Sequence, residues 1–294
     1  MQLELLLGAI EHSLSDETIC AIRSLDGWGE APLHRLVERG PQQHGASDIG
    51  FRLDPRVGTV VLSVDAGDLA TLWTRRALLL SWLRPTSGEK TLRFTLDDGT
   101  VRCFVGHSAG QMTLPLEARR ALAWDVGLQF VCGDPTCYDP EAQTLTFRLG
   151  GSAGTGFTVP TYVPTGMGAS VIAGAQAVAY AGTWRAHPTI RITGPITDCV
   201  ITNESTGETI DFSGVTIDAG ETRDIDLRYG HKTVLDQDGA NCIAEVTPDS
   251  DLATFHIADD QEVEDGINTI RVTGTDADAA TRIDLTWFVR YTGI

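Results

Sequence analysis

Residues 122–132, LAWDVGLQFVC, place an apolar side chain at every second position: Leu122, Trp124, Val126, Leu128, Phe130 and Cys132. Successive side chains of a β-strand point to opposite faces of the sheet, so this period of two predicts a strand with one buried face. The run ends at Gly133-Asp134-Pro135, which favours a turn. A chain that contains such a strand is expected to be mainly β.

The residues before this strand predict further strands. After a short alternating strand at Leu3 to Leu7, residues 8–56 contain many turn-forming residues, and loops are expected to dominate there. Val57 to Val64 is rich in β-branched residues and predicts a strand. Thr91 to Leu96 and Val101 to Val105 alternate on either side of an Asp-Gly pair, which is typical of a hairpin.

One α-helix is expected in this half, from Leu69 to Leu83, where leucines and Trp73 recur at helical spacing. Asp65 or Asp68 can act as its N-cap. Pro85 ends it, because the residue before proline avoids the α conformation.

The second half predicts an antiparallel β-sandwich, because many short strands follow one another with turn residues between them. The expected strands are Thr144 to Leu149, Ser170 to Tyr180, Thr189 to Thr193, Val200 to Thr202, Thr209 to Phe212, Arg223 to Arg228, Ile243 to Val246, Thr254 to Ile257, Thr269 to Thr273 and Arg282 to Arg290. At 294 residues the chain has the length of about two domains. We place the boundary near Tyr138, which gives domains 1–138 and 139–294.

Charge is distributed unevenly along the chain, which has a formal net charge of −18. Residues 203–265 contain 17 acidic and 3 basic residues, a net charge of −14, which indicates a solvated acidic surface. Such a field repels phosphates, so no nucleic-acid partner is expected. The longest apolar run, Ala77 to Leu83, is too short for a membrane span, and no basic region of a secretory signal precedes Leu3. We therefore expect no membrane partner and synthesis in the cytosol.

No catalytic, cofactor-binding or metal-binding residue is expected, and no cofactor. Six cysteines are scattered without the paired spacing of a zinc site, and none of the seven histidines pairs at metal-ligand spacing. Reduced, buried thiols are expected, with a disulfide between Cys132 and Cys137 as the alternative.

Two short motifs suggest chemistry but lack the context that it needs. Gly106 to Gly110 matches the G-x-S-x-G pattern of α/β-hydrolases, in which Ser108 would be the nucleophile at a turn from strand to helix. Pro115 lies where that helix should run, so a loop after a strand is expected instead. The Asp236 to Asn241 segment resembles half of a calcium loop, but Pro248 stands where the loop's glutamate would fall. A β-turn through Asp238-Gly239 is expected, with a cation site as the alternative.

The order of features resembles the distal tail protein (Dit) family of long-tailed, siphovirus-type phages and related viruses. In the first half the resemblance rests on Gly40 to Gly45, on the Leu-Trp-Thr-Arg-Arg helix that ends Leu83-Arg84-Pro85, on Asp98-Gly99 and on Phe130 to Pro135. In the second half it rests on Tyr180 to Thr183, Pro188 to Pro195, Ile201 to Gly207, Asp224 to Leu227 and Trp287 to Ile294.

This resemblance implies a structural virion protein and not an enzyme. The N-terminal domain would be a tail-tube-like β-barrel or sandwich with one α-helix that forms a ring, usually a hexamer. The C-terminal domain would be a galectin-like sandwich whose final strand can return toward the ring domain. Implied partners are further copies of the chain, the tail tube protein, the tail-tip or baseplate hub and, as an option, the tape measure protein. The implied location is the distal end of the virion tail, after assembly in the host cytoplasm.

Two other functions are compatible with the sequence. A sandwich can serve as a carbohydrate-binding adhesin if aromatic side chains are exposed, and the second half offers Tyr162, Tyr180, Trp184, Tyr229 and Tyr291, whereas Trp287 alternates with core positions. A serine hydrolase acting through Ser108 is the remote alternative.

Overall fold

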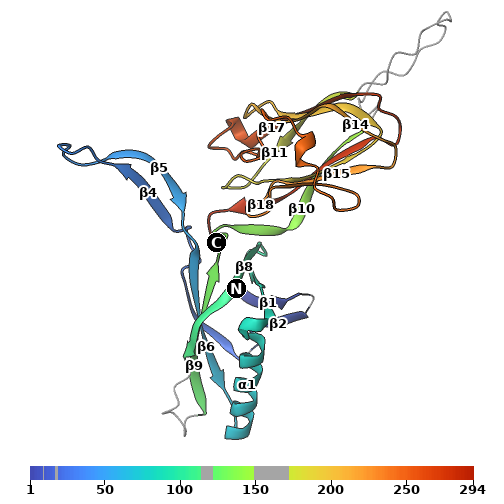
Figure 1. Cartoon of the computed structure of the whole chain (residues 1–294). Coiled ribbons are helices and arrows are strands. Elements are labelled where there is room, and N and C mark those ends of the chain that lie inside the picture. Colours follow the sequence, from blue (N-terminus) through green and yellow to red (C-terminus); the bar gives the residue numbers. More distant parts are fainter. Residues whose placement is uncertain (9, 17–18, 114–121, 149–171) are drawn as a thin grey trace, which may run out of the picture. The chain divides into compact units, whose positions relative to one another are not determined.

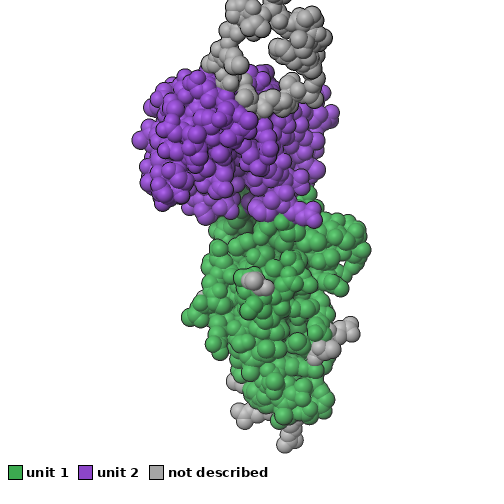
Figure 2. Space-filling view, turned by 90° about the vertical axis from the view of Figure 1, so that its right-hand side faces the viewer, with its two compact units in different colours: residues 1–140, 291–294 green, residues 141–290 purple. Residues whose placement is uncertain are grey.

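The structure is a computed structural model that describes residues 1–8, 10–16, 19–113, 122–148 and 172–294. The chain divides into two compact units, residues 1–140 with 291–294 and residues 141–290 (Figure 2). We call them unit 1 and unit 2. That each unit folds as an independent domain stays a prediction.

Unit 1 is built on seven antiparallel strands in the order β2-β1-β7-β8-β9-β6-β3 (Figure 1). Their bounds are β1 Gln2–Leu7, β2 Ile10–Ser13, β3 Ala21–Asp26, β6 Arg56–Asp65, β7 Lys90–Thr95, β8 Val101–Thr113 and β9 Ala123–Cys132. The long strand β8 pairs with β7 through its first half and with β9 through its second half. The described strands form an open path from β2 to β3, so the barrel option of the prediction is not realised.

Strand alternation fills the core of unit 1 as the sequence predicts. Trp124, Val126, Leu128, Phe130 and Cys132 are buried on one face of β9, whereas Leu122 just before the strand is exposed. Both edges of β9 are paired within the chain, with β6 and with β8. An unpaired edge of this strand is therefore not available for assembly.

The predicted helix is α1, Leu69–Trp82, and Asp68 is its N-cap. The Asp68 carboxylate accepts a hydrogen bond from the Thr71 amide at 2.9 Å, which satisfies one of the free donors of the first turn. A 3₁₀ turn, η1 Pro85–Ser87, follows. None of the helices in the described part of the chain is long and apolar enough to cross a membrane.

The prediction that loops dominate residues 8–56 is wrong. Besides β2 and β3, this region contains the hairpin strands β4, Leu33–Glu38, and β5, Ser47–Leu53, which pair only with each other in the described structure. Neither strand has a buried face, and alternation between apolar and polar residues arises only where one face is buried. The sequence signal for these strands is therefore absent.

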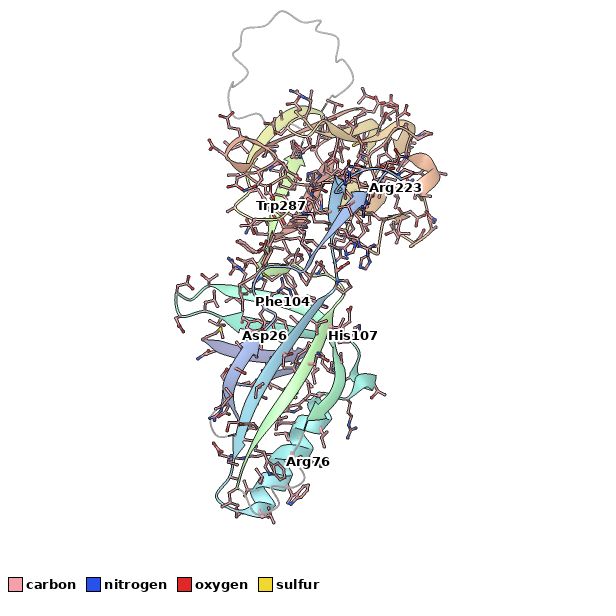
Figure 3. The ribbon with its side chains drawn as sticks, turned by 90° about the vertical axis from the view of Figure 1, so that its left-hand side faces the viewer. Asp26, Arg76, Phe104, His107, Arg223 and Trp287 are labelled. Atoms are coloured by element: carbon pink, nitrogen blue, oxygen red, sulfur yellow. The ribbon has the colours of Figure 1, made fainter. Side chains whose placement is uncertain are left out.

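Unit 2 is an antiparallel sandwich of two sheets, in the orders β11-β17-β13-β14 and β16-β15-β12-β18-β10. The bounds are β10 Cys137–Arg148, β11 Ile172–Ala179, β12 Thr189–Thr193, β13 Ile196–Asn203, β14 Glu208–Ile217, β15 Thr222–Asp226, β16 Thr233–Asp236, β17 Ile267–Thr275 and β18 Arg282–Tyr291. The core between the sheets contains Phe212, Phe255 and Trp287, the last of which is labelled in Figure 3. The predictions of a mainly β chain and of a sandwich in the second half are confirmed.

Two of the strands predicted in unit 2 are not formed, and one strand was missed. Ile243–Glu245 is a 3₁₀ turn, η3, and only Ile257 of the segment Thr254 to Ile257 makes a bridge, to Ala186. Strand β16 was not predicted. Another 3₁₀ turn, η4 Glu264–Gly266, precedes β17.

Candidate interaction surfaces

The base of the β4–β5 hairpin is held by a buried arginine. The Arg56 side chain is fully buried, and its guanidinium donates to the carbonyl oxygens of Gly27, Gly29, Pro135 and Thr292 at 2.7 to 2.8 Å. Burial lowers the pKa of Arg56, while the four carbonyl dipoles replace the water that a buried cation loses. One side chain thus connects the segment before β4, the turn after β9 and the residues after β18.

Close packing reinforces this base. The indole of Trp28 donates to the Thr59 carbonyl at 3.1 Å and packs against Phe94 and Phe104. A Cβ atom on Gly58 would lie 2.3 Å from the Trp28 ring, so only glycine fits there. The Ile294 amide donates to the Trp28 carbonyl at 3.2 Å, which binds residues 291–294 into unit 1. The hairpin therefore starts from a rigid platform.

The hairpin itself presents apolar side chains to solvent. Cross-strand pairs Leu33–Leu53 and Arg35–Phe51 put Leu33, Val37 and Phe51 on one face, which we call the arm face. These three side chains are 47%, 60% and 48% exposed. A two-stranded hairpin is marginally stable in water without a third strand or a packing partner. Such a surface is typical of an element that is covered in an assembly.

A second exposed apolar surface lies on α1. Leu69, Trp73 and Leu80 recur at helical spacing next to the row of the buried Leu72 and Leu79, and each of the three is about 40% exposed. We call this stripe the helix face. The Trp73 ring also packs edge to face against Trp124, at 5.3 Å between ring centres.

Arginine is the only charged residue type in and just after α1. Residues 69–88 contain Arg75, Arg76 and Arg84 and no acidic residue. The Arg76 guanidinium lies over the Trp73 ring at 5.2 Å, and its Nε is buried without a hydrogen-bond partner among the described residues (Figure 3). A hollow of about 230 Å³ adjoins the end of the helix and is lined partly by Leu80, Leu83 and Leu128.

Ser108 lies beside this hollow, in β8, and the loop expected there is a strand. Its hydroxyl donates to the Leu83 carbonyl at 2.9 Å, and its backbone pairs with Phe130 of β9. The neighbouring His107, labelled in Figure 3, has its Nε2 3.9 Å from Glu89. A nucleophile elbow needs a sharp turn between a strand and a helix, which this position in the middle of a strand does not provide.

Unit 2 has a groove of about 560 Å³ across the exposed face of its five-stranded sheet. Arg191 binds Asp224 through two hydrogen bonds of 2.6 and 2.9 Å, and Arg282 donates to Asp284 at 2.8 Å. No aromatic side chain lines the groove in the described part of the chain. The stacking platform that a sugar-binding face would offer is therefore missing here.

The aromatic residues considered for sugar binding do not gather on one surface. Tyr180 is buried, and its hydroxyl donates a hydrogen bond to the Trp184 carbonyl at 2.6 Å. The Tyr291 ring packs against the Arg102 guanidinium in unit 1. Tyr229 is exposed but covers His187 at 4.5 Å between ring centres. Tyr162 lies outside the described residues.

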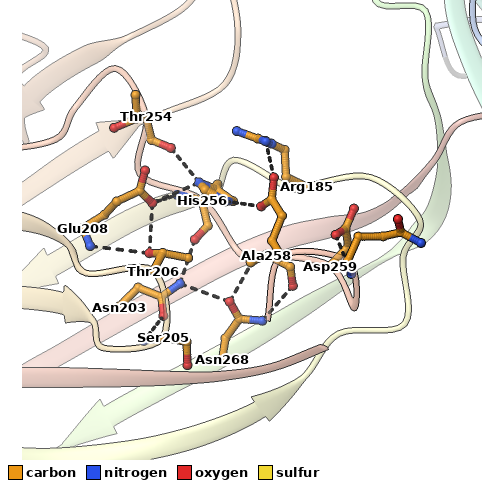
Figure 4. Close-up of polar contacts among 12 residues, drawn as sticks. Arg185, Asn203, Ser205, Thr206, Glu208, Thr254, His256, Ala258, Asp259 and Asn268 are labelled. Atoms are coloured by element: carbon orange, nitrogen blue, oxygen red, sulfur yellow. Dashed lines mark hydrogen bonds and ion pairs between the residues drawn. The ribbon is translucent and has the colours of Figure 1, made fainter. Parts of the chain in front are cut away.

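A cluster of buried polar side chains fixes the loop from Ser250 to Gly266 to the sandwich (Figure 4). His256 lies between two carboxylates, 2.9 Å from Glu208 and 2.7 Å from Glu262, and Arg185 also pairs with Glu262. Burial opposes the charged imidazole, but hydrogen bonds and charge from Glu208 and Glu262 outweigh it and raise the pKa of His256. Burial likewise opposes the Glu208 carboxylate, and the hydrogen bonds with His256 outweigh it and lower the pKa of Glu208.

His187 stays neutral in the same region. Burial lowers its pKa to about 4, and its Nδ1 bonds to the Phe255 carbonyl at 2.9 Å, so Nδ1 carries the proton. Its Nε2 is buried without a hydrogen-bond partner among the described residues. Metal ligation is not indicated, because no group of three or more His, Cys, Asp or Glu residues that could hold a metal occurs in the described ranges.

The Asp236 segment forms the predicted turn. The Asp236 carboxylate accepts from the amides of Asp238 and Ala240 at 2.9 and 2.8 Å, and the Gly239 amide donates to the Asp236 carbonyl. Gly239 has a φ of +80°, which favours glycine. One oxygen of the Asp236 carboxylate, Oδ1, therefore serves to fix the turn.

All six cysteines are free thiols, and five of them are buried. Burial raises the pKa of Cys132 and of Cys137 to about 11, so both are protonated at neutral pH. The alternative of a Cys132–Cys137 disulfide is not realised.

No protein-family model matches this sequence, and no curated protein matches it significantly. Among solved structures it is similar to the Dit protein (gp 19.1) of phage SPP1, described as a paradigm of the hub adsorption apparatus in phages that infect Gram-positive bacteria. The identity is 14%, the TM-score is 0.63, and the match covers 98% of both chains. The chain therefore has the Dit fold, as the sequence resemblance predicted. Two structures of the phage p2 baseplate, activated with Ca or with Sr, match at 8% identity and a TM-score of 0.47 over 97% of both chains.

Proposed function

We propose that this chain, which has the fold of the phage hub protein SPP1 Dit, is a structural subunit of a phage tail. The observation that carries the proposal is the extent of the match, because one fold spans 98% of both chains and includes both units. If the match came only from a β-sandwich, a common fold, in one unit, the other unit would not be covered by it.

Within the tail we assign the chain to a distal ring that connects the tail tube to the tail-tip or baseplate proteins. The ring consists of copies of this chain, six by family resemblance, and is formed by unit 1. Support comes from the arm face and the helix face, two partly exposed apolar surfaces in unit 1. The tape measure protein is a further candidate partner. Assembly takes place in the host cytoplasm.

Unit 2 carries the acidic stretch 203–265, which we place outside the ring channel. Its net charge of −14 keeps this unit soluble by self-repulsion and disfavours phosphate binding. We therefore expect no shift of duplex DNA by the full chain in a low-salt gel assay. Submicromolar binding would contradict the charge argument.

We also propose that the protein has no enzymatic activity. Ser108, the one residue for which a catalytic role was considered, has its hydroxyl bonded to a backbone carbonyl within a strand. A fluorophosphonate probe should leave it unlabelled. Labelling that the Ser108→Ala substitution abolishes would contradict this assignment.

Electron microscopy of the purified full chain tests the structural role directly. We expect closed rings with a central hole, because a closed ring covers both apolar surfaces of every copy. Monomers that bind an oligosaccharide on a glycan array would favour the adhesin alternative instead.

A further inference from the structure

We infer that the outer edge of β11 in unit 2 accepts an extended segment of another protein, which adds as a fifth strand to the sheet β11-β17-β13-β14. This segment carries apolar residues at alternate positions, a basic residue at the end beside Ala179, and no acidic residue. The inference goes beyond the proposed function, because it concerns unit 2 and holds whether or not unit 1 forms a ring.

The backbone of β11 uses one of its two edges within the described chain. All eight residues pair with β17, and β11 ends the sheet (Figure 1). The Tyr180 amide donates to the Gly266 carbonyl, so the even-numbered residues face β17, because backbone direction alternates along an antiparallel strand. The outward-facing residues are Ala173, Ala175, Ala177 and Ala179, all of them exposed. The register agrees, since Thr269, opposite Ala177, turns its carbonyl away from β11 to the Glu204 amide.

This edge lacks the features that usually prevent a strand from pairing with another chain. Protected edges are short, charged, bulged or interrupted by proline. The sequence of β11, IAGAQAVA, contains no charge and no proline, and its pairing with β17 has no bulge. By contrast, β14 at the opposite edge of the sheet is covered, because the Ser250 hydroxyl and the Asp251 carboxylate accept hydrogen bonds from two of its amides. The β11 edge is therefore open to strand addition.

The side chains around the edge indicate an apolar pattern in the added strand. Gln176 donates to the Thr146 carbonyl at 3.0 Å, which places the end of β10 next to β11. Leu145 of β10 and Val178 of β11 are partly buried against the core of the sandwich. Alternate side chains of a strand share one face, so apolar residues at every second position would cover both. On the outer face the alanines present only methyl groups, which leaves room for larger neighbours.

Charge favours a basic segment and disfavours a second copy. The Ala179 end of the edge lies next to the turn η4, because the residue that follows it pairs with Gly266. Glu264 and Asp265 of this turn are exposed, and in the part of the chain that the structure describes neither forms an ion pair. They adjoin a hollow of about 490 Å³. Two copies of unit 2 would repel each other, since each has a net charge of −14 over residues 203–265.

Hydrogen exchange of the full-length protein tests whether the edge is open. In the free protein we expect the Ala175 and Ala177 amides to exchange at least about tenfold faster than those of Gln176 and Val178, because only the latter two donate to β17. NMR spectroscopy resolves these neighbours. Equal protection of the four amides would show that another element or a second copy covers the edge, and would overturn the inference.

Binding is measured with a synthetic peptide that has the β17 sequence, INTIRVTGT, preceded by two lysines. This sequence already pairs with β11 on the inner edge and contains no acidic residue. In an antiparallel arrangement its lysines reach the Ala179 end. We expect fluorescence anisotropy to detect binding to the full chain, and exchange of the Ala175 and Ala177 amides to become slower.

Two N-methylated forms of the peptide are the controls. Each carries methyl groups on the amides of alternate residues, so that one form loses the amides that face β11 and the other loses those that face away. We expect one form to bind and the other not to bind. Equal behaviour of the two forms, or no binding of the unmodified peptide, would overturn the inference.

Variants of the chain locate the contact. Ala175→Pro removes an outward amide without loss of a bond to β17, and edge strands tolerate proline in that orientation. We expect it to weaken peptide binding at least about tenfold. Ala175→Thr, which keeps the amide, should bind like the wild type. Thermal unfolding checks that both variants are folded. Undiminished binding by folded Ala175→Pro would overturn the inference, and the methylated peptides decide the matter if this variant does not fold.

A further variant tests the basic end of the segment. Glu264→Gln/Asp265→Asn should bind the peptide with two lysines more weakly than the wild type does, and should bind the peptide without them equally well. The same effect on both peptides would overturn the assignment of a basic end. None of these outcomes depends on ring formation, so failure of this inference leaves the proposed function standing, and absence of rings leaves this inference standing.

Discussion

At the scale of single residues, the Arg56 side chain connects its own strand to three other segments of unit 1. Its most distant partner in the sequence, Thr292, lies 236 positions away. We expect Arg56→Met to lower the free energy of unfolding of unit 1 by at least about 3 kcal/mol, because four carbonyls lose a charged donor. Urea unfolding of the full chain measures this.

The control for Arg56 is Arg23→Met. The Arg23 side chain is 66% exposed, and its ion pair with Asp125 is long, at 3.8 Å. Its removal should therefore change the free energy of unfolding by no more than about 0.5 kcal/mol. Arg56→Lys should be intermediate, since an ammonium cannot reach four carbonyls. Equal losses for Arg56→Met and Arg23→Met would show that the guanidinium does not hold the base together.

His187 predicts a pH dependence of unit 2. Its pKa is lowered from 6.5 to about 4 in the folded chain, so the unfolded state takes up a proton first as the pH falls. The stability contribution of His187 is present above pH 6.5 and is lost as the pH falls toward 4. His256 has a raised pKa and acts in the opposite direction, because its contribution is lost as the pH rises.

The measurement compares wild type with His187→Gln between pH 7 and 4.5. The wild type should lose about 2–3 kcal/mol more than the variant over this range, since each pKa unit corresponds to about 1.4 kcal/mol. The control His44→Gln removes an exposed histidine and should follow the wild type. Parallel curves for wild type and His187→Gln would refute the assignment of a neutral buried imidazole.

At the scale of elements, the buried amide of Asn268 is one of the contacts that attach the loop preceding β17. Asn268 of β17 accepts from the Ala258 amide and donates to the carbonyls of Ala258 and Gly266 at 2.8 to 3.1 Å. We expect Asn268→Leu to remove the partners of the Ala258 amide and carbonyl, and hydrogen exchange at Ala258 to become at least tenfold faster. Gln261→Leu, on the exposed part of the same loop, should leave that exchange unchanged. Unaltered exchange in both variants would mean that another contact holds the loop.

At the scale of the whole molecule, residues 291–294 decide what a fragment of unit 1 must contain. The sequence-based prediction is that residues 1 to about 138 suffice to form a ring while the sandwich stays monomeric. The structure adds that Thr292 supplies one of the four acceptors of Arg56, and that Ile294 binds the Trp28 carbonyl.

Removing residues 291–294 from the full chain should therefore lower the stability of unit 1 by about 1–3 kcal/mol, the effect of a lost partner of a buried charge. The stability of unit 2 should not change. Differential scanning calorimetry with light scattering measures stability and assembly together. A truncated chain as stable as the full one would show that unit 1 is complete without these residues.

The sequence by itself determined the mainly β class, the position of α1, the strand β6 and the buried face of β9. The β-branched residues of β6 favour a strand, and one buried face imposes a period of two on β9 and of 3.6 on α1. The tertiary structure alone decided the β4–β5 hairpin, since a ribbon exposed on both faces carries no such period. It also decided the paired edges of β9, the convergence of four carbonyls on Arg56 and the neutral His187. These features depend on residues far apart in the chain, and local sequence patterns do not record which distant segments meet.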